Sequence, residues 1–463
     1  MRIKKIAVEN LFGSLNHVVE LNSDARVTIV LGANGIGKTH LLECVSALFS
    51  ARLQRLVAVP FSALKVELDD DTTLRVDQRS VEIPLADSHI EETIVSRRMA
   101  RRSERRTQVR RKLTIQLVRS DGSPATEPWE PSSRSERKQR GDVELPAWLE
   151  PVEFGYWLDQ RSDRLLTTRE LRVLYGHEEG AYDDLPAWFK ATLERTSVRL
   201  IETQRLLRTH RKQSRVPAHL AENRAVQFAV RDLLEDLSGR VQTAGQRYNR
   251  QAAALDQSYV DRFLRYEASP EGAPDDLQQR LADIASRRSR LERLSLLDAE
   301  PSTQSAARLT TVTAEKRLAL SLFASDMDDK LKALEPLADQ LEKLLDIVNR
   351  KLANTSKKLV TDAAVGLVVE TVGNHRLDLE QLSSGEQHEL VLLYDLLFRV
   401  RRESLVLIDE PELSLHPAWQ EEFADDLMAI AQAKEFDVVL ATHSPYIVGS
   451  RTSLCVTLPT SKT

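Results

Sequence analysis

The sequence predicts an α/β fold with a mostly parallel main sheet, divided along the chain by an insertion and a coiled-coil-like helical arm. Three observations support this prediction. A glycine-rich turn at residues 32–39 follows a strand pattern and precedes a helix pattern. After residue 365, short apolar strands alternate with helices, which is typical of a parallel sheet. Between these regions, residues 218–355 carry a helical pattern with few interruptions.

The first part of the predicted α/β head covers residues 1–78. Within residues 2–31, three short segments are rich in β-branched residues and separated by polar turns, so we expect three strands. A helix is expected over 38–51, directly after the glycine-rich turn. Residues 62–78 predict a hairpin with an acidic turn, because two alternating segments flank three consecutive aspartates.

Residues 79–197 are interpreted as an insertion, because prolines and charge runs replace the strand pattern. Its most distinctive stretch, 97–112, holds nine cationic side chains against one acidic side chain. A helix would display them as a stripe, since they recur in pairs about every four residues. The cations are Arg97, Arg98, Arg101, Arg102, Arg105, Arg106, Arg110, Arg111 and Lys112.

Three interpretations of this basic stretch stay open. It is a solvated or internally paired surface, a patch for nucleic-acid phosphates, or a site for an acidic partner protein. Aromatic residues do not interleave with the cations. Base stacking on single strands is therefore not supported.

A strand pattern returns at 198–203, and we assign 198–217 to the head. Residues 218–360 are predicted to form the helical arm. Unbroken, 306–354 would span roughly 70 Å at 1.5 Å per residue, and Pro336 is expected to kink it. The alternative is a set of helices packed on the head. The apolar stripe consists of Leu320, Phe323, Met327, Leu331, Leu334, Leu337, Leu341, Leu344, Val348 and Leu352.

The last part of the head is predicted over 361–463. Strands are expected at 365–372 and 375–382, followed by a helix across 384–402. The apolar runs at 405–409 and 437–444 predict buried strands, and a helix is expected to begin near Pro417 between them.

Composition limits the class of protein. The chain has 463 residues, 41% of them hydrophobic, and a net charge of −5, so it is not a uniformly basic nucleic-acid coat. Its two cysteines, Cys44 and Cys455, exclude a disulfide framework and a four-cysteine zinc site. We find neither a signal-peptide pattern nor an apolar run of the ~20 residues that a membrane helix needs. We therefore expect a soluble, cytoplasmic protein without a membrane partner.

The glycine-rich turn, GANGIGKT, matches the pattern G-x-x-x-x-G-K-[ST]. Its glycines let backbone N–H groups turn toward phosphates, and the following helix adds partial positive charge. Lys38 is expected to reach the β- and γ-phosphates and Thr39 to ligate Mg²⁺. The nucleotide-binding residues predicted here are Gly32, Asn34, Gly35, Ile36, Gly37, Lys38, Thr39 and His40.

A pair of carboxylates, Asp409 and Glu410, follows the apolar run 405–408. Open α/β sheets bind ligands at this carboxyl edge. Asp409 suits an outer-shell role on Mg²⁺, and Glu410 is placed to polarise the attacking water. A solvated strand end is the alternative, which the glycine-rich turn upstream disfavours.

A second small-residue turn, LSSGE at 382–386, precedes a predicted helix and forms a second anion site. It makes sense if Ser383, Gly385 and Glu386 cap the γ-phosphate bound by another copy of the chain. The alternative is an ordinary serine N-cap completed by Glu386. His443 follows the last apolar strand, and we predict that it senses the γ-phosphate, although a lone histidine is more often structural.

These four motifs, GANGIGKT, LSSGE, LVLIDEPE and ATHS, occur in the order found in the ABC ATPase superfamily, which the chain resembles. The run LIDEPELSLHPAWQ resembles the RecF, SMC and OLD-like branch (AAA_15/AAA_21-like), with 414–417 as the D-loop region. The resemblance covers roughly 1–80, 195–215 and everything after 365. It implies ATP and Mg²⁺ as cofactors, Lys38, Glu410 and His443 as catalytic residues, and two sites closed between two copies.

By the same resemblance, Gln204 corresponds to the Q-loop glutamine that contacts Mg²⁺ with Thr39 and Asp409, and Gln160 is its rival. The chain departs from the family pattern at His40, which stands where a second Ser/Thr usually follows the lysine. Ser384 and Glu386 replace the Gly and Gln of the transporter signature. About 345 residues separate Lys38 from Ser383, much more than in transporter heads.

Segments 201–206, 248–264 and 382–398 resemble the ATPase subunits of PARIS- and Septu-type anti-phage defence. OLD proteins carry a nuclease after the switch histidine, whereas 20 residues follow His443 here. The resemblance therefore implies a homodimer or higher homo-oligomer that acts as sensor or scaffold for a separate effector protein. The alternatives are a RecF/SMC-like ATPase that clamps DNA and an interaction protein that hardly hydrolyses ATP.

Overall fold

The computed structural model describes residues 1–84, 107–131, 149–153, 156–159, 164–167, 185–202, 218–265, 274–298, 313–373, 375–413 and 415–459. The chain divides into two compact units. The first comprises Met1–Thr209 and Val400–Thr463, and the second comprises His210–Arg399.

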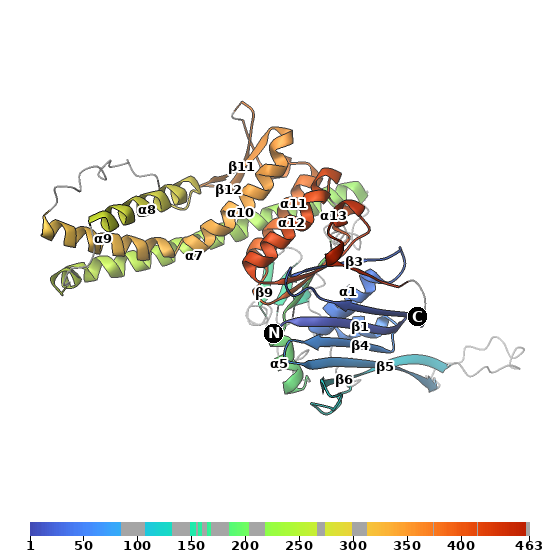
Figure 1. The fold of residues 1–463 in the computed structure, drawn as a ribbon. Coiled ribbons are helices and arrows are strands. Elements are labelled where there is room, and N and C mark those ends of the chain that lie inside the picture. Colours follow the sequence, from blue (N-terminus) through green and yellow to red (C-terminus); the bar gives the residue numbers. More distant parts are fainter. Residues whose placement is uncertain are drawn as a thin grey trace, which may run out of the picture. The chain divides into compact units, whose positions relative to one another are not determined.

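The first unit contains a parallel five-stranded sheet, as predicted (Figure 1). Its strand order is β10 (Val198–Glu202), β14 (Leu405–Asp409), β15 (Asp437–Ala441), β3 (Val27–Leu31) and β16 (Cys455–Thr457). Glu202, Asp409 and Ala441 lie opposite one another in register. The carboxyl ends of the three strands therefore meet at one edge, where such sheets bind ligands.

A second, antiparallel sheet lies in the same unit, in the order β2 (Leu15–Glu20), β1 (Ile3–Leu11), β4 (Ala63–Leu68), β5 (Thr72–Pro84) and β6 (Thr107–Arg119). The hairpin expected over 62–78 is confirmed as β4 and β5. The three strands predicted over 2–31 also form, but they divide between the sheets. β1 and β2 pair as a hairpin, whereas β3 joins the parallel sheet.

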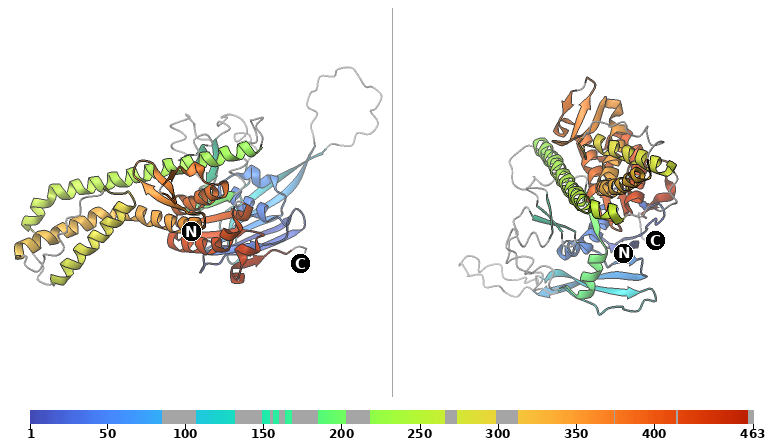
Figure 2. Two further views of the ribbon diagram at one scale, coloured as in Figure 1. Left: turned by 90° about the horizontal axis from the view of Figure 1, so that it is seen from above. Right: turned by 90° about the vertical axis from the view of Figure 1, so that its left-hand side faces the viewer.

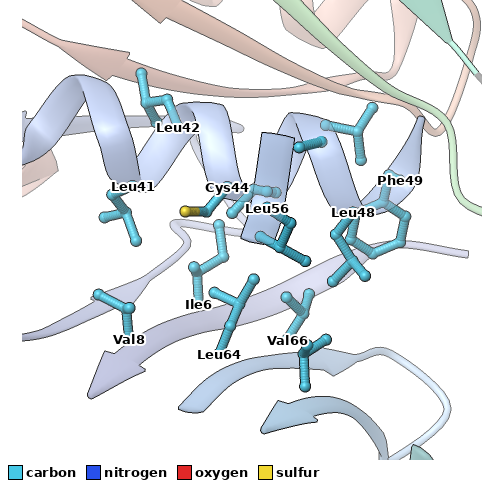
Figure 3. Close-up of a cluster of buried hydrophobic side chains, with 14 of the residues drawn as sticks. Ile6, Val8, Leu41, Leu42, Cys44, Leu48, Phe49, Leu56, Leu64 and Val66 are labelled. Atoms are coloured by element: carbon cyan, nitrogen blue, oxygen red, sulfur yellow. The ribbon is translucent and has the colours of Figure 1, made fainter. Parts of the chain in front are cut away.

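Helix α1 (Lys38–Phe49) contacts β10 and β14 of the parallel sheet and forms one hydrophobic cluster with the antiparallel sheet. Figure 3 shows Leu41, Cys44 and Leu48 of α1 pointing toward β1 and β4, whose contributions include Ile6 and Leu64. Each such fully buried leucine stabilises the fold by about 1.5–3 kcal/mol. The cluster fixes the helix that carries the glycine-rich turn at its start.

Further described elements belong to the first unit. They are α2 (Leu53–Ala58), β7 (Leu149–Glu153), β8 (Tyr156–Asp159), β9 (Arg164–Thr167), α5 (Ala187–Arg195), α12 (Pro417–Lys434) and α13 (Pro445–Val448), with 3₁₀ turns at Pro411–Leu413 and Thr452–Leu454. The helix predicted to begin near Pro417 is thus α12, and Pro417 occupies its first turn.

The structure corrects the helical interpretation of the basic stretch for its last three cations. Arg110, Arg111 and Lys112 lie in β6, which pairs antiparallel with β5 along its length. Arg111 donates to the backbone carbonyls of Val57 and Ala58. Cross-strand pairing with β5 overrides the helical spacing here. Arg97, Arg98, Arg101, Arg102, Arg105 and Arg106 lie outside the described residues.

The described helices of the second unit include α7 (Ala218–Arg265), α8 (Pro274–Arg293), α9 (Ala314–Lys332) and α10 (Glu335–Leu352). Figure 2 shows α7, α8 and α9 lying alongside one another. Asp256 pairs with Lys330 and Arg262 with Asp326, so α7 and α9 run antiparallel. The expected interruption near Pro336 is confirmed, since α9 ends just before it and α10 begins at Glu335.

One position in the predicted apolar stripe is wrong. Phe323 is 48% exposed, whereas Leu322 is buried at 4%. From Met327 to Leu352 the stripe holds, and its leucines are buried. α9 packs on both α7 and α8, and at this point the face that it buries carries Leu322 and Ala324 instead of Phe323.

A three-stranded antiparallel sheet follows α10, with β11 (Lys357–Asp362), β12 (Gly366–Thr371) and β13 (Arg376–Leu377). β11 was not predicted. The strand predicted over 375–382 is largely wrong, because Asp378 and Gln381 form a capping box that turns Leu379–Gln381 into a 3₁₀ helix. The helix predicted over 384–402 is α11 (Ser384–Tyr394), continued by a π-helical turn at Asp395–Arg399.

Among the described residues, none of the helices combines the length and the apolar character that crossing a bilayer requires.

Candidate functional site

The turn between β3 and α1 has the backbone that its glycines predict. Gly35 and Gly37 have φ values of 81° and 92°, in the left-handed region that favours glycine. A Cβ on Gly37 would lie 2.7 Å from Leu11 Cδ2, so a side chain there would collide with the core. Gly37 is also the N-cap of α1. The first backbone N–H groups of α1 therefore open onto this turn as an anion site.

Lys38 lies deep in this turn, with 4% of its surface exposed. Its Nζ donates to the Gly32 carbonyl at 2.9 Å and contacts Nε2 of His443. Burial lowers the pKa of Lys38, and the carboxylates of Glu410, Asp409 and Glu412 oppose that shift. The lysine charge is thus held beside the carboxyl edge of the sheet.

Asp409 ends β14, and the Thr39 hydroxyl hydrogen-bonds to it. Burial raises the pKa of Asp409 to about 6, and the nearby charges of Glu410 and Glu43 add to the rise. A desolvated carboxylate next to a hydroxyl is a donor set that suits Mg²⁺. The described residues hold no cluster of three or more His, Cys, Asp or Glu side chains that would bind a metal alone.

Glu410 stands one residue beyond the strand in a strained conformation. Its φ is 47°, unusual for a residue with a side chain, and its backbone N–H donates to the Ala441 carbonyl at 2.9 Å. Strained backbone of this kind costs of order 1–3 kcal/mol and often marks functional sites. It places the Glu410 carboxylate 3.7 Å from Nε2 of His443.

The structure reveals a residue that the sequence analysis missed. The Glu412 carboxylate accepts from the backbone N–H of His443 at 2.6 Å and from the Thr442 hydroxyl at 2.8 Å. Gln420 extends this network, since its amide donates to the Leu415 carbonyl and accepts from the Ser444 hydroxyl. In the sequence, Glu412 is visible only as a third carboxylate two residues after the Asp–Glu pair. Its partner, His443, lies 31 residues further along the chain, so the sequence alone does not reveal the contact.

His40, predicted to contact nucleotide, packs edge-on against Phe12, with ring centroids 4.9 Å apart. Both rings line a pocket of about 370 Å³ on the flank of α1, together with Glu43, Arg55 and Leu200. Phe12 is 44% exposed and has a φ of 53°. Asn34 is exposed within the turn, whereas Ile36 is buried.

In the second unit, Ser383 is the N-cap of α11. It forms a capping box with Glu386, whose carboxylate accepts from the Ser383 backbone N–H at 2.8 Å. Lys357 of β11 holds the same carboxylate at 2.9 Å. The ordinary N-cap that the sequence left open is therefore present, and Gly385 lies in the first turn of the helix.

Gln204, Gln160 and Ser414 lie outside the described residues. Of the D-loop region, His416 is the N-cap of α12 and accepts from the Ala418 backbone N–H. The structure thus brings together Lys38, Thr39, Asp409, Glu410 and His443 in the first unit. Ser383, Gly385 and Glu386 form a separate turn in the second unit.

A curated protein and several solved structures are similar to this chain. The thiamine import ATP-binding protein ThiQ of Chelativorans sp. (strain BNC1) is 38% identical over 65 residues, which is 14% of this chain. The chain spans only a quarter of the length of that relative.

Among solved structures, the Smc head domain with an extended coiled coil, bound to the C-terminal domain of ScpA, from Pyrococcus furiosus matches with 13% identity. That match covers 100% of this chain and 94% of the other, with a TM-score of 0.33. The SMC head domain from Thermotoga maritima matches with 10% identity, 97% and 91% coverage and a TM-score of 0.32.

The family model described as "AAA domain, putative AbiEii toxin, Type IV TA system" matches residues 27–449. This range runs from β3 to α13. It contains the glycine-rich turn, the small-residue turn at 382–386, the Asp409–Glu410 pair and His443. The chain therefore belongs to this family and is an ABC-like P-loop ATPase.

Proposed function

We propose that this protein binds ATP with Mg²⁺ and hydrolyses it at the carboxyl edge of the parallel sheet, in a site completed by a second copy of the chain. One observation carries the proposal. Lys38 comes from α1, Glu410 follows β14 and His443 follows β15, yet all three side chains meet. A lysine, a carboxylate and an imidazole within contact distance suit phosphoryl transfer to water.

Each side chain has a distinct role in this proposal. Lys38 and the backbone N–H groups of the turn bind the β- and γ-phosphates. Thr39 and Asp409 would hold Mg²⁺, which supplies charge neutralisation on the phosphate oxygens. Glu410 orients the attacking water and takes up its proton. Glu412 accepts a hydrogen bond from the backbone N–H of His443 and so holds this residue. The His443 side chain donates a hydrogen bond to the γ-phosphate.

The turn at Ser383 supports the proposal that a second copy of the chain completes the ATP site. Its Ser–Gly sequence opens a helix, and Glu386 is already used inside the capping box and by Lys357. The remaining N–H groups of α11 are suited to an anion. We assign them to the γ-phosphate held by the partner copy.

The test uses two variants and a control. Lys38→Ala should abolish binding of ATP, measured by titration with a fluorescent ATP analogue. Glu410→Gln should bind ATP with nearly unchanged affinity and lower turnover about 10²- to 10⁴-fold, because only the proton acceptor is removed. Glu421→Gln changes an exposed carboxylate on α12 and should leave both quantities unchanged. Normal turnover in Glu410→Gln would refute the catalytic assignment.

We further propose that the ATP-bound dimer is a sensor or scaffold for a separate effector, a nuclease or toxin, in anti-phage defence. The resemblance of 201–206, 248–264 and 382–398 to defence ATPases supports this role. The family description, which refers to a toxin and a toxin–antitoxin system, is consistent with it. Purification of tagged wild type and Glu410→Gln from the native host tests it, with co-purifying proteins identified by mass spectrometry. Absence of any nuclease or toxin in both samples would count against it.

A second candidate function is binding of DNA, and the nine cations of residues 97–112 favour it. Each phosphate contact would contribute about −0.9 to the slope of log affinity against log salt. Charge reversal of Arg97, Arg98, Arg101 and Arg102 should then make that slope less negative. A slope near zero in the wild type would exclude this function.

A further inference from the structure

A histidine that no motif includes lies directly beneath the glycine-rich turn. His17 belongs to β2, where it shares the buried face with Val19, and its exposed fraction is 0%. On this face of a strand an apolar residue is the ordinary choice. A fully buried imidazole therefore calls for a polar contact that justifies it.

That contact is with the glycine-rich turn itself. Nε2 of His17 lies 2.7 Å from the backbone carbonyl of Ile36, in a buried hydrogen bond. A carbonyl oxygen only accepts, so Nε2 carries the proton and donates. Nδ1 is buried and, within the part of the chain that the structure describes, has no hydrogen-bond partner.

The Ile36 carbonyl needs such a donor. It precedes the N-cap Gly37, whose own carbonyl accepts the first helical hydrogen bond from the Leu41 N–H. Ile36 is 5% exposed, so water does not readily replace a protein donor. A buried carbonyl without a partner costs about 1–3 kcal/mol.

The same peptide lies between the two left-handed glycines, Gly35 and Gly37. In this conformation the turn directs its N–H groups toward the anion site, so its orientation depends on what holds the carbonyl on the opposite side. An apolar side chain at position 17 would avoid the cost of the unpartnered Nδ1. The role of the ring therefore lies in the Nε2 donor.

We propose that His17 is a positioning residue of the nucleotide site, which fixes the Ile36 carbonyl and thereby aims the N–H groups of the turn at the phosphates. The proposal rests on the proposed binding of ATP at this turn, but not on hydrolysis or on a partner copy. It assigns to the antiparallel sheet an indirect part in binding nucleotide, through the backbone of the turn.

The test compares two substitutions of this residue. His17→Leu keeps an apolar side chain of similar size and removes the donor, whereas His17→Gln returns an N–H at a similar reach. The leucine variant should weaken ATP binding roughly three- to tenfold, as expected for the loss of one buried hydrogen bond. KM for ATP should rise with it, while kcat at saturating ATP stays within about twofold. The glutamine variant should recover most of the affinity.

Val19→Ala is the matched control, because Val19 lies on the same buried face of β2 and its truncation destabilises the sheet without touching the Ile36 carbonyl. It should leave the Kd for ATP unchanged. Hydrogen exchange without nucleotide adds a second measurement. Amides of residues 33–39 should exchange faster in His17→Leu and return toward the wild-type rate in His17→Gln.

Unchanged affinity and unchanged exchange in His17→Leu would overturn this inference while leaving the proposed function intact. Equal weakening by Val19→Ala would also overturn it, since the effect would then follow general stability. If the wild type and Lys38→Ala both fail to bind ATP, the proposed function and this inference fail together.

Discussion

Burial decides the chemistry of the carboxylate that ends β14. The pKa of Asp409 is raised to about 6, chiefly because its surroundings exclude water. In the folded protein Asp409 therefore binds a proton more tightly than in the unfolded chain, where its pKa is near 3.8. Through this group, lowering the pH from 7.5 to 5 stabilises the folded state without metal or nucleotide.

Asp409→Asn tests this linkage. The amide carries no charge, so the variant should be more stable than the wild type at pH 7.5. That advantage should shrink at pH 5, where the wild-type carboxyl is protonated. Urea unfolding of both proteins at the two pH values, without Mg²⁺ or ATP, measures the difference. An advantage of the same size at both pH values would contradict the raised pKa.

A neighbouring carboxylate acts through the backbone instead. Glu412 accepts hydrogen bonds from the His443 N–H and the Thr442 hydroxyl, so its loss should free the histidine. Hydrogen bonds to charged groups are worth about 1.5–3 kcal/mol. Glu412→Ala should therefore lower kcat about 10- to 100-fold with little change in KM for ATP, and Glu412→Gln should fall between. Steady-state ATPase assays check this, with Glu421→Gln as control, and a wild-type kcat in Glu412→Ala would argue against the positioning role.

At the scale of elements, two ion pairs fasten α11 to its neighbours. Lys357 of β11 pairs with Glu386, and Lys351 of α10 pairs with Glu389. The second pair is almost fully buried, with side chains 2% and 4% exposed. Removing one member of such a pair leaves an uncompensated charge, which typically costs 3–5 kcal/mol.

Lys351→Met should thus destabilise the protein by about 3–5 kcal/mol, whereas the double variant Lys351→Met/Glu389→Leu should lose much less. Lys332→Met, at a side chain that is 63% exposed, should change stability little. Urea unfolding measures all three variants. If the double variant were as unstable as Lys351→Met alone, the uncompensated charge of Glu389 would not be the main cause of the destabilisation.

Elements whose pattern is local could be predicted from the sequence. The turn at 32–39 and the strand before Asp409 depend on residues within a few positions of one another. β11 was missed because its strand character appears only when β12 pairs with it. The alternation of apolar and polar residues over 375–382 predicts a strand. The structure instead forms the Asp378–Gln381 capping box, which depends on side-chain geometry that the alternation does not show.

The candidate site shows the same division. Its motif residues follow from spacing along the chain. The partners that hold them do not, because Glu412 meets His443 only through the parallel pairing of β14 with β15. His17 meets Ile36 only because the β1–β2 hairpin packs under the turn. Such contacts depend on the register between distant segments, which a single sequence does not reveal.

At the scale of the whole molecule, we propose that two helix starts in the described part of the chain bind anions, at Gly37 and at Ser383. Lysine, carboxylates and histidine surround the first, which suits a complete triphosphate. At the second, we propose that the helix N–H groups and the serine hydroxyl contact the phosphate, since the nearby Lys357 is already paired with Glu386. A turn of this kind binds weakly by itself, and gains affinity when another surface already holds the phosphate. Two copies arranged head to tail would thus complete two sites at once.

The Glu410→Gln variant tests this arrangement directly. If turnover opens the dimer, a variant that binds but scarcely hydrolyses ATP should accumulate as the dimer when Mg²⁺ and ATP are present, and return to the lighter species without them. Light scattering coupled to size exclusion reports the mass of each species. Adding Ser383→Arg should restore the lighter species, because a bulky cation replaces the hydroxyl at the turn while leaving Lys38 in place. An ATP-dependent dimer that persists with Ser383→Arg would mean that another surface joins the two copies.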